Sequence, residues 1–179
     1  MQESNQNLWK KKRLLHLGWD TLGDCVERIN AQIENSAFRP TTIVGISRGG
    51  LGLASFIANY HHIQDFYVVA ITRNLSDQKF HRGAHAQFAW MAPQSATFAN
   101  QRVLVADDII GDGNTLALAI DILRDMGAAD IRTAVIAKNV NSQFEPDFKA
   151  FTVDDWLIFP WERVESVAGL QLEEIRLTG

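Results

Sequence analysis

One segment of the sequence, residues 103–116, constrains the fold more than any other. It begins with the apolar run Val-Leu-Val-Ala, continues with Asp107 and Asp108, and passes through a glycine-containing turn into the periodic apolar residues 114–126. The apolar run predicts a buried strand, and the periodic residues predict a helix that ends at Gly127. In open α/β sheets ligands bind beyond the carboxyl ends of the strands, so this turn is a candidate binding site.

The residue types in this turn indicate which ligand it binds. Adjacent carboxylates such as Asp107 and Asp108 can accept hydrogen bonds from two sugar hydroxyls or hold a divalent cation. Gly111 and Gly113 let backbone N–H groups approach a phosphate, and the start of the helix adds a partial positive charge. Together they predict a ribose 5-phosphate site. The alternative is that the acids only cap the helix and the glycines only form a tight turn.

A second turn has a related composition. Residues 41–46 are short, apolar and β-branched, which predicts a buried strand, and residues 51–60 have helical spacing. Between them, Ser47, Arg48 and Gly49 form a turn that is rich in hydrogen-bond donors. Arg48 can hold a diphosphate bidentately. Alone this turn is equally consistent with an ordinary connection, and the acidic turn strengthens the functional interpretation.

The remaining pattern alternates helices with strands. A helix is predicted over residues 19–34, and further strands over residues 66–72 and 131–137. Residues 73–100 show no sustained period, which is typical of a functional lid or an irregular excursion. The alternation predicts an α/β fold with a mainly parallel central sheet that is flanked by helices.

Composition sets the broad class of the protein. With 179 residues, of which 46% are hydrophobic, we expect one domain over residues 1–179. The net charge of −4 gives no general reason to expect nucleic acid as a partner. The lone Cys25 favours a reducing cytoplasm, and no run approaches the ~20 apolar residues that cross a bilayer. The basic run 10–13 fits a solvated cluster or contact with an anionic surface.

These features resemble the type I phosphoribosyltransferases, and most closely the bacterial xanthine-guanine (6-oxopurine) branch. The resemblance covers most of the chain through landmarks in the same order. They are the opening helix at residues 18–22, the pyrophosphate loop at 46–51, the ribose-phosphate motif at 103–116, the base-binding lysine at Lys138 and the C-terminal hood motif at 155–162.

The resemblance implies how phosphoribosyl pyrophosphate is held. Asp107 and Asp108 would bind the ribose hydroxyls, and Asp108 with Glu162 would bind magnesium (Mg2+) as cofactor. The pyrophosphate would contact Ser47, Arg48 and Gly49. The 5′-phosphate would contact Gly111, Asp112, Gly113, Asn114 and Thr115.

The resemblance also implies how a nucleobase is bound. Lys138 would donate to an exocyclic oxygen, Trp156 would stack on the ring, and the backbone of Leu157 would read its edge. Trp156 and Leu157 would belong to a small hood that is formed by about residues 139–179. Without the family, the sequence alone favours a core aromatic residue for Trp156 and an exposed lysine at a strand end for Lys138.

The catalysis implied is displacement at the anomeric carbon with oxocarbenium character, in which Asp107, Asp108, Arg48 and Lys138 take part. The segment 73–100 would close to exclude water. Candidates to reach the pyrophosphate from it are Lys79, His81, Arg82 and His85.

Two residues depart from the 6-oxopurine pattern. Gly111 stands where those enzymes carry an aspartate that contacts the base, and Asp112 stands where they carry a phosphate-binding threonine. A carboxylate beside a phosphate costs a few kcal/mol unless it turns away or is protonated. Two functions therefore stay open: a magnesium-dependent phosphoribosyltransferase acting on a purine, or a non-catalytic regulatory protein that binds a nucleotide or phosphoribosyl pyrophosphate. A homo-oligomer is common among relatives, so we expect a dimer or tetramer.

Overall fold

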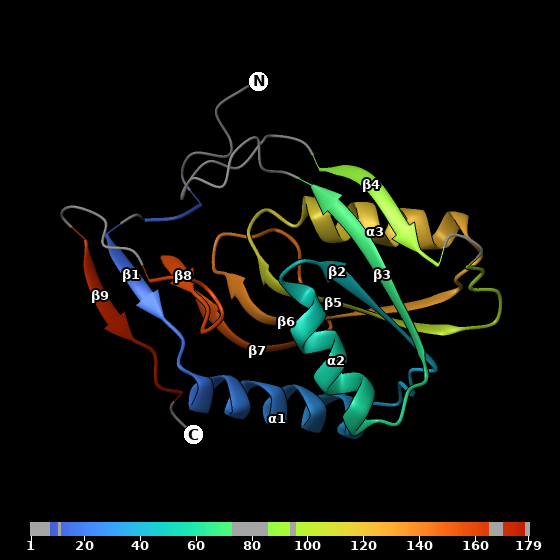
Figure 1. Ribbon diagram of the computed structural model, residues 1–179, viewed down its shortest axis with the longest axis horizontal. Helices are drawn as coiled ribbons and strands as arrows, with labels where there is room; N and C mark the ends of the chain where they lie inside the picture. Colours follow the sequence, from blue (N-terminus) through green and yellow to red (C-terminus); the bar gives the residue numbers. More distant parts are fainter. Residues whose placement is uncertain (1–7, 11, 73–85, 94–95, 165–169, 178–179) are drawn as a thin grey trace.

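The computed structural model describes residues 8–10, 12–72, 86–93, 96–164 and 170–177. Residues 73–85, with Lys79, His81, Arg82 and His85, lie outside this range, so the closing segment expected there stays a prediction. The helices and strands in chain order are β1 (Arg13–His16), α1 (Trp19–Asn35), β2 (Thr42–Ser47), α2 (Gly50–Tyr60), β3 (Asp65–Thr72), β4 (Gln87–Ala92), β5 (Arg102–Ile110), α3 (Asn114–Asp125), β6 (Asp130–Asn139), β7 (Phe148–Val153), β8 (Trp156–Ile158) and β9 (Gln171–Glu174) (Figure 1).

The main sheet has six strands in the order β4-β3-β2-β5-β6-β7. All neighbouring strands run parallel except β3 and β4, which are antiparallel. Helices α1 and α2 cover one face and α3 covers the other (Figure 1). The predicted α/β fold with a mainly parallel central sheet is confirmed.

Strand β5 shows why the sheet is covered on both faces. Its side chains alternate, so Leu104 and Ala106 join the core cluster beneath α1 and α2. Val103 and Val105 join the cluster under α3. All four are fully buried. A strand with four consecutive buried apolar residues requires cover on both of its faces.

Two strands differ from the sequence-based prediction. Strand β5 extends beyond Ala106 to Ile110, because Ile109 and Ile110 are buried and pair with β6. The two acids therefore lie inside the last part of the strand rather than after it. Strand β4 lies within the stretch 73–100 that was predicted to be irregular. It is an edge strand with five of its six residues exposed, so its sequence carries no alternating pattern.

The hood also differs from the prediction. It is a three-stranded parallel sheet in the order β8-β1-β9, so its central strand comes from the N-terminal part of the chain. Conversely, β7 lies within the expected hood range 139–179 but forms the edge of the main sheet beside β6. The physical reason is that β1 is buried at Leu14 and Leu15 and needs a strand on each side.

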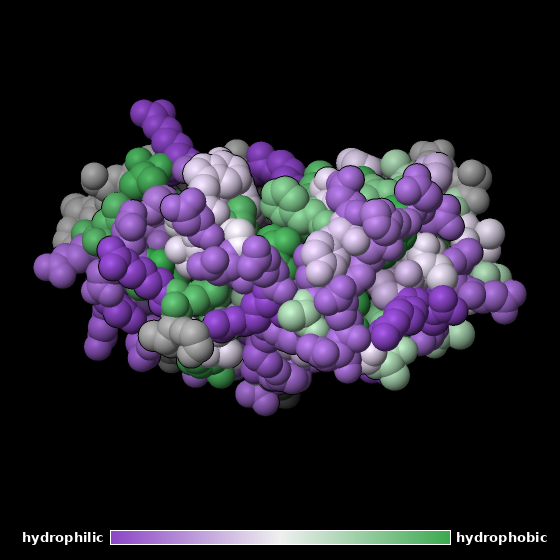
Figure 2. Space-filling model, turned by 90° about the horizontal axis from the view of Figure 1, so that it is seen from below, coloured by the Kyte–Doolittle hydropathy of each residue, from purple (hydrophilic) through white to green (hydrophobic). Residues whose placement is uncertain are grey.

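The surface adds little to the assignment of partners. The face seen from below in Figure 2 is mainly hydrophilic and is interrupted by small apolar patches. No helix in the described ranges is long and apolar enough to span a membrane. The homo-oligomer stays a prediction.

Candidate active site

A cleft of about 740 Å³ opens where the carboxyl ends of β2, β3 and β5 meet. Because β2 and β5 are neighbouring parallel strands, the two turns singled out in the sequence arrive at the same edge of the sheet. The residues that line this cleft are Ile46, Ser47, Arg48, Gly49, Ala70, Ile71, Thr72, Ala89, Trp90, Asp107, Asp108, Ile109, Thr115, Trp161 and Glu162.

The first turn packs tightly against β5, and its glycines make this possible. A Cβ atom on Gly49 would lie 1.9 Å from the Oδ2 atom of Asp108, and one on Gly50 would lie 2.3 Å from the carbonyl oxygen of Ala106. Any side chain at these positions would push the two loops apart. The peptide bond between Ser47 and Arg48 is cis. The glycines thus place Arg48 close to the acid pair.

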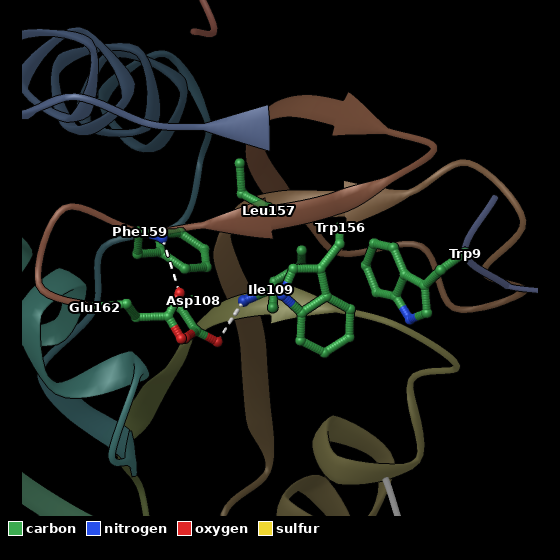
Figure 3. A pocket seen from close by; sticks show the side chains of 7 residues that line it. All are labelled: Trp9, Asp108, Ile109, Trp156, Leu157, Phe159 and Glu162. Carbon is green, nitrogen blue, oxygen red and sulfur yellow. Dashed lines mark hydrogen bonds between the residues drawn. The ribbon is translucent and has the colours of Figure 1, made fainter. Parts of the chain in front are cut away.

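The acid pair is held by its own backbone. Asp107 is only 8% exposed, and its Oδ1 accepts a hydrogen bond from the N–H of Asp108 at 2.9 Å. The Oδ1 of Asp108 accepts from the N–H of Ile109 at 2.7 Å. Across the cleft, the Oε2 of Glu162 accepts from the N–H of Phe159 at 2.9 Å (Figure 3). Three carboxylates from two segments therefore face the same space.

The arrangement suits magnesium bound together with a phosphate-containing substrate. Within the described part of the chain, no group of three or more His, Cys, Asp or Glu side chains is close enough to hold an ion alone. Magnesium usually takes one or two carboxylates and completes its shell with water and substrate phosphates. Asp108 and Glu162, which both line the cleft, supply such oxygen ligands, so the residues present fit the ion.

The ribose-phosphate loop closes back on itself at Asp112. Its Oδ1 accepts a hydrogen bond from the N–H of Asn114 at 3.0 Å, and its Oδ2 accepts from the Asn114 side chain at 3.1 Å. Thr115 lines the main cleft, whereas Gly111, Asp112 and Gly113 line a small adjoining hollow. The half-buried carboxylate thus uses one of the backbone donors that a phosphate would use at the start of α3.

Gly113 is the position in this loop where the backbone itself requires glycine. Its φ is +88°, a left-handed conformation. A Cβ atom there would also lie 2.3 Å from the Cβ of Phe144. The loop is therefore fixed both by its own conformation and by the segment between β6 and β7.

On the hood side, Trp156 and Leu157 border a second hollow next to the cleft (Figure 3). Its volume is about 40 Å³, and it shares Asp108 and Glu162 with the main cleft. The space suits a few water molecules and is smaller than a nucleobase. The residues that border it are Trp9, Asp108, Ile109, Trp156, Leu157, Phe159 and Glu162.

Lys138 does not border any of these three spaces. Its Nζ forms an ion pair with the Oε2 of Glu145 at 2.8 Å, and its side chain is only 12% exposed. The hydrogen bond from Lys138, together with one from Lys149, lowers the pKa of Glu145 below its usual value. In this structure the expected base-binding lysine is thus engaged by the segment between β6 and β7.

Several site residues were missed by the sequence analysis. The end of β3, including Thr72, could have been found from the rule that neighbouring parallel strands end at the same edge of a sheet. Trp161 stacks on Phe159 with ring centroids 4.7 Å apart, and the same rule does not reveal it. Neither Trp90 on the edge strand β4 nor Trp9 near the N-terminus carried a sequence signal.

Comparison with known proteins agrees with this geometry. Over 119 residues the chain is 29% identical to the transcriptional regulator GfcR of Methanocella arvoryzae. The aligned region covers 64% of this chain and 53% of that protein. The chain thus spans about half the length of this curated relative.

Solved structures share the fold at low identity. A purine phosphoribosyltransferase from Pyrococcus horikoshii has a TM-score of 0.73 at 21% identity, covering 86% of this chain and 97% of that one. The xanthine-guanine-hypoxanthine phosphoribosyltransferase of Helicobacter pylori has a TM-score of 0.67 at 19% identity, and the match covers 84% of this chain and 93% of that one. A hypothetical protein from Neisseria gonorrhoeae with bound ppGpp has a TM-score of 0.72 at 18% identity, and the match covers 86% of this chain and 92% of that one.

The sequence model of the phosphoribosyl transferase domain matches residues 18–165, which include both turns and the hood strand β8. With the central sheet, the acid pair and the glycine turn in one cleft, the family assignment rests on sequence and structure together. The chain belongs to the phosphoribosyl transferase domain family.

Proposed function

We propose that this protein is a magnesium-dependent phosphoribosyltransferase that transfers ribose 5-phosphate from phosphoribosyl pyrophosphate to a purine base and releases pyrophosphate. The observation that carries the proposal is the shared cleft of Arg48 and the acid pair, with Gly49 in direct contact with Asp108. That contact sets a donor for the leaving group beside acceptors for the sugar hydroxyls.

The charged residues of the cleft and Thr115 each have a role in this reaction. Asp107 and Asp108 accept hydrogen bonds from the ribose hydroxyls and stabilise positive charge that develops on the sugar ring. Arg48 neutralises the pyrophosphate as it leaves. Bound through Asp108 and Glu162, magnesium would supply charge stabilisation on the same group. Thr115 and the neighbouring backbone bind the 5′-phosphate.

The reaction breaks the bond between the anomeric carbon and pyrophosphate and forms one to a ring nitrogen. The ring proton leaves to solvent or to the pyrophosphate, since Gly111 offers no side chain to accept it. Holding the two reactants in one cleft supplies most of the acceleration.

We assign the base to the hood side of the cleft. Trp156 stacks on the ring and Leu157 contacts its edge, and their hollow adjoins the acid pair. Lys138 reaches the base only after leaving Glu145. The purine class is supported by the names of the similar structures from Pyrococcus and Helicobacter, and the xanthine-guanine branch belongs to the same proposal. We also propose that the protein is a cytoplasmic homo-oligomer that binds neither nucleic acid nor a membrane.

The direct experiment incubates the protein with magnesium, phosphoribosyl pyrophosphate and single purine and pyrimidine bases, and detects nucleotide by mass. We expect nucleotide from at least one purine. The Asp108→Asn variant should lower kcat/KM by about 100- to 1,000-fold, as loss of a group that stabilises transition-state charge does. Asp125→Asn, on the exposed end of α3, is the matched control and should match the wild type. Binding of phosphoribosyl pyrophosphate without turnover of any base would reject the transferase.

A regulatory function is the second candidate, and the Asp112 carboxylate favours it. The carboxylate already occupies a backbone donor at the start of α3, and GfcR is a transcriptional regulator. The Asp112→Thr variant tests whether this carboxylate faces the phosphate, whereas turnover of any base would reject the non-catalytic function. If the carboxylate opposes the phosphate, this variant should bind ribose 5-phosphate about tenfold more tightly than the wild type, as expected for relief of roughly 1.4 kcal/mol of repulsion. Equal affinity would mean that Asp112 does not face the phosphate.

A further inference from the structure

The segment before β1 is bound to the end of β6. The carbonyl oxygen of Leu8 accepts hydrogen bonds from the side-chain amides of Asn139 at 2.8 Å and Asn141 at 3.2 Å. Asn139 is fully buried and directly follows Lys138. Its Oδ1 accepts from the N–H of Asn141 at 2.8 Å. A buried amide next to the expected base-binding lysine therefore obtains its acceptor from the N-terminal segment.

The same segment is bound at its other end to the hood. Asp155 is fully buried, and its Oδ2 accepts from the backbone N–H groups of Lys12 at 3.0 Å and Arg13 at 2.9 Å. Its Oδ1 accepts from the N–H of Trp156 at 2.9 Å. One carboxylate thus joins the N-terminal segment directly to the residue that is expected to stack on the base. We call residues 8–10 with 12–13 the N-terminal strap.

The charges of the strap contribute to this attachment. Lys10 pairs with Asp154, and Arg13 pairs with Asp154 at 3.2 Å and Glu173 at 2.8 Å. The backbone N–H of Lys10 also donates to the carbonyl oxygen of Asp154 at 3.1 Å. The cations at both of these positions are therefore used within the chain to fix the strap to the hood.

Between the two attachments lies Trp9. Its ring meets that of Trp156 at a centroid distance of 5.8 Å and an interplanar angle of 65°, an edge-to-face contact. Both rings border the hollow that also contains Asp108, and in Figure 3 Trp156 lies between Ile109 and Trp9. Trp9 therefore restricts the tilt of Trp156 from the side away from the acid pair.

We propose that the N-terminal strap is part of the ring-binding site and that Trp9 is a positioning residue, which holds Trp156 at the angle needed to stack on a planar nucleobase. The inference rests on the proposed function, because it assigns a residue to the same site. It predicts a selective effect: Trp9 contributes to recognition of the ring and contributes nothing to recognition of the ribose phosphate.

The test measures binding to the full chain by calorimetry in the presence of magnesium. The probes are ribose 5-phosphate and the monophosphates AMP, GMP, IMP, XMP and UMP. Trp9→Ala should weaken binding of the best nucleotide about three- to tenfold while leaving ribose 5-phosphate within about twofold. Trp9→Phe should restore most of the nucleotide affinity because it keeps an aromatic edge. Trp19→Ala, at a 63% exposed tryptophan on α1, is the matched control and should behave as the wild type.

The outcomes separate the inference from the function beneath it. Unchanged nucleotide affinity in Trp9→Ala would overturn the role of Trp9 and leave the proposed function in place. Equal weakening of both probes would also overturn it, because that pattern reports a general loss of structure. A wild type that binds neither ribose 5-phosphate nor any nucleotide would overturn the proposed function, and with it the inference.

Discussion

The two sides of the cleft are built in different ways. The phosphate side, residues 47–50 and 107–115, consists of two strand-to-helix turns on neighbouring strands of the main sheet. The ring side, consisting of Trp9 and residues 154–162, joins segments that are more than 140 residues apart in the chain. Main-chain packing at glycines fixes the first side, and side-chain carboxylates and aromatic contacts fix the second.

The two sides are therefore sensitive to different kinds of substitution. At Gly49 and Gly50 on the phosphate side a single added carbon has no space, because the neighbouring atoms belong to the acid pair or to the backbone of β5. On the ring side the structure depends on a few buried polar groups, chiefly Asp155, whose loss leaves several N–H groups without an acceptor.

The largest effect is expected from Gly50→Ala on the phosphate side. The new Cβ would lie 2.3 Å from the Ala106 carbonyl oxygen, so α2 and β5 must separate. We expect the free energy of unfolding in urea to fall by about 3 kcal/mol, in the upper range for overpacking. Gly52→Ala is the matched control in the same helix. It meets nothing within 4 Å and should stabilise by about 0.5 kcal/mol. Equal stability of the two variants would contradict the tight packing of the phosphate side.

Asp155→Ala is expected to have the next largest effect, on the ring side. It removes the acceptor of three backbone N–H groups, those of Lys12, Arg13 and Trp156. The free energy of unfolding should fall by about 2 kcal/mol, the cost of leaving buried donors unsatisfied. Affinity for a nucleotide should fall more than affinity for ribose 5-phosphate. An equal loss of affinity for both ligands would show that the two sides of the cleft are energetically coupled.

A smaller, pH-dependent effect is expected at Asp154. Hydrogen bonding from Lys10, aided by the charges of Lys10 and Arg13, lowers the pKa of this carboxyl below its usual value. A group with a lowered folded pKa contributes stability above its unfolded pKa, about 3.9, and loses that contribution as the pH falls through the folded value. Asp154→Asn should therefore cost less than about 1 kcal/mol at pH 7, and the difference from the wild type should shrink below pH 4. A difference that stays constant from pH 7 to pH 2 would contradict the ion pairs.

The smallest effect is expected at Cys25, in the core cluster beneath α1 and α2. Burial raises the pKa of its thiol to about 12, so it is neutral and covered near neutral pH. Native protein should react with a thiol reagent at pH 8 only as fast as it unfolds. Labelling should be accelerated more in Gly50→Ala than in Asp155→Ala, since the former disturbs packing against the main sheet. Fast labelling of the native wild type would contradict the burial.

The sequence predicted the phosphate side well because each of its parts is local. Apolar β-branched runs, the Asp107–Asp108 pair and glycine turns lie within two short segments, and parallel strands bring their ends to one edge. In the structure, one cleft is lined by Ser47, Arg48, Gly49, Asp107, Asp108, Thr115 and Glu162. The chemical roles assigned to them stay proposals.

The hood was predicted only in part, because its contacts are not local. The family resemblance pointed to Trp156 and Leu157, but nothing in the pattern indicated that β1 would pair between β8 and β9. Lys138 was expected at the base, and its ion pair with Glu145 depends on the connection to β7. Edge strand β4 gave no signal because most of its residues face solvent.

The sequence alone thus predicted the α/β class, the order of the elements from α1 to β6 apart from β4, and the two turns that form the phosphate side. Periodicity and glycine placement act over a few residues, so a chain records them directly. Tertiary structure alone decided that Trp9 contacts Trp156. For Trp9 the reason is distance along the chain: residues 9 and 156 carry no mutual signal until Asp155 and the pairing of β1 with β8 bring them together.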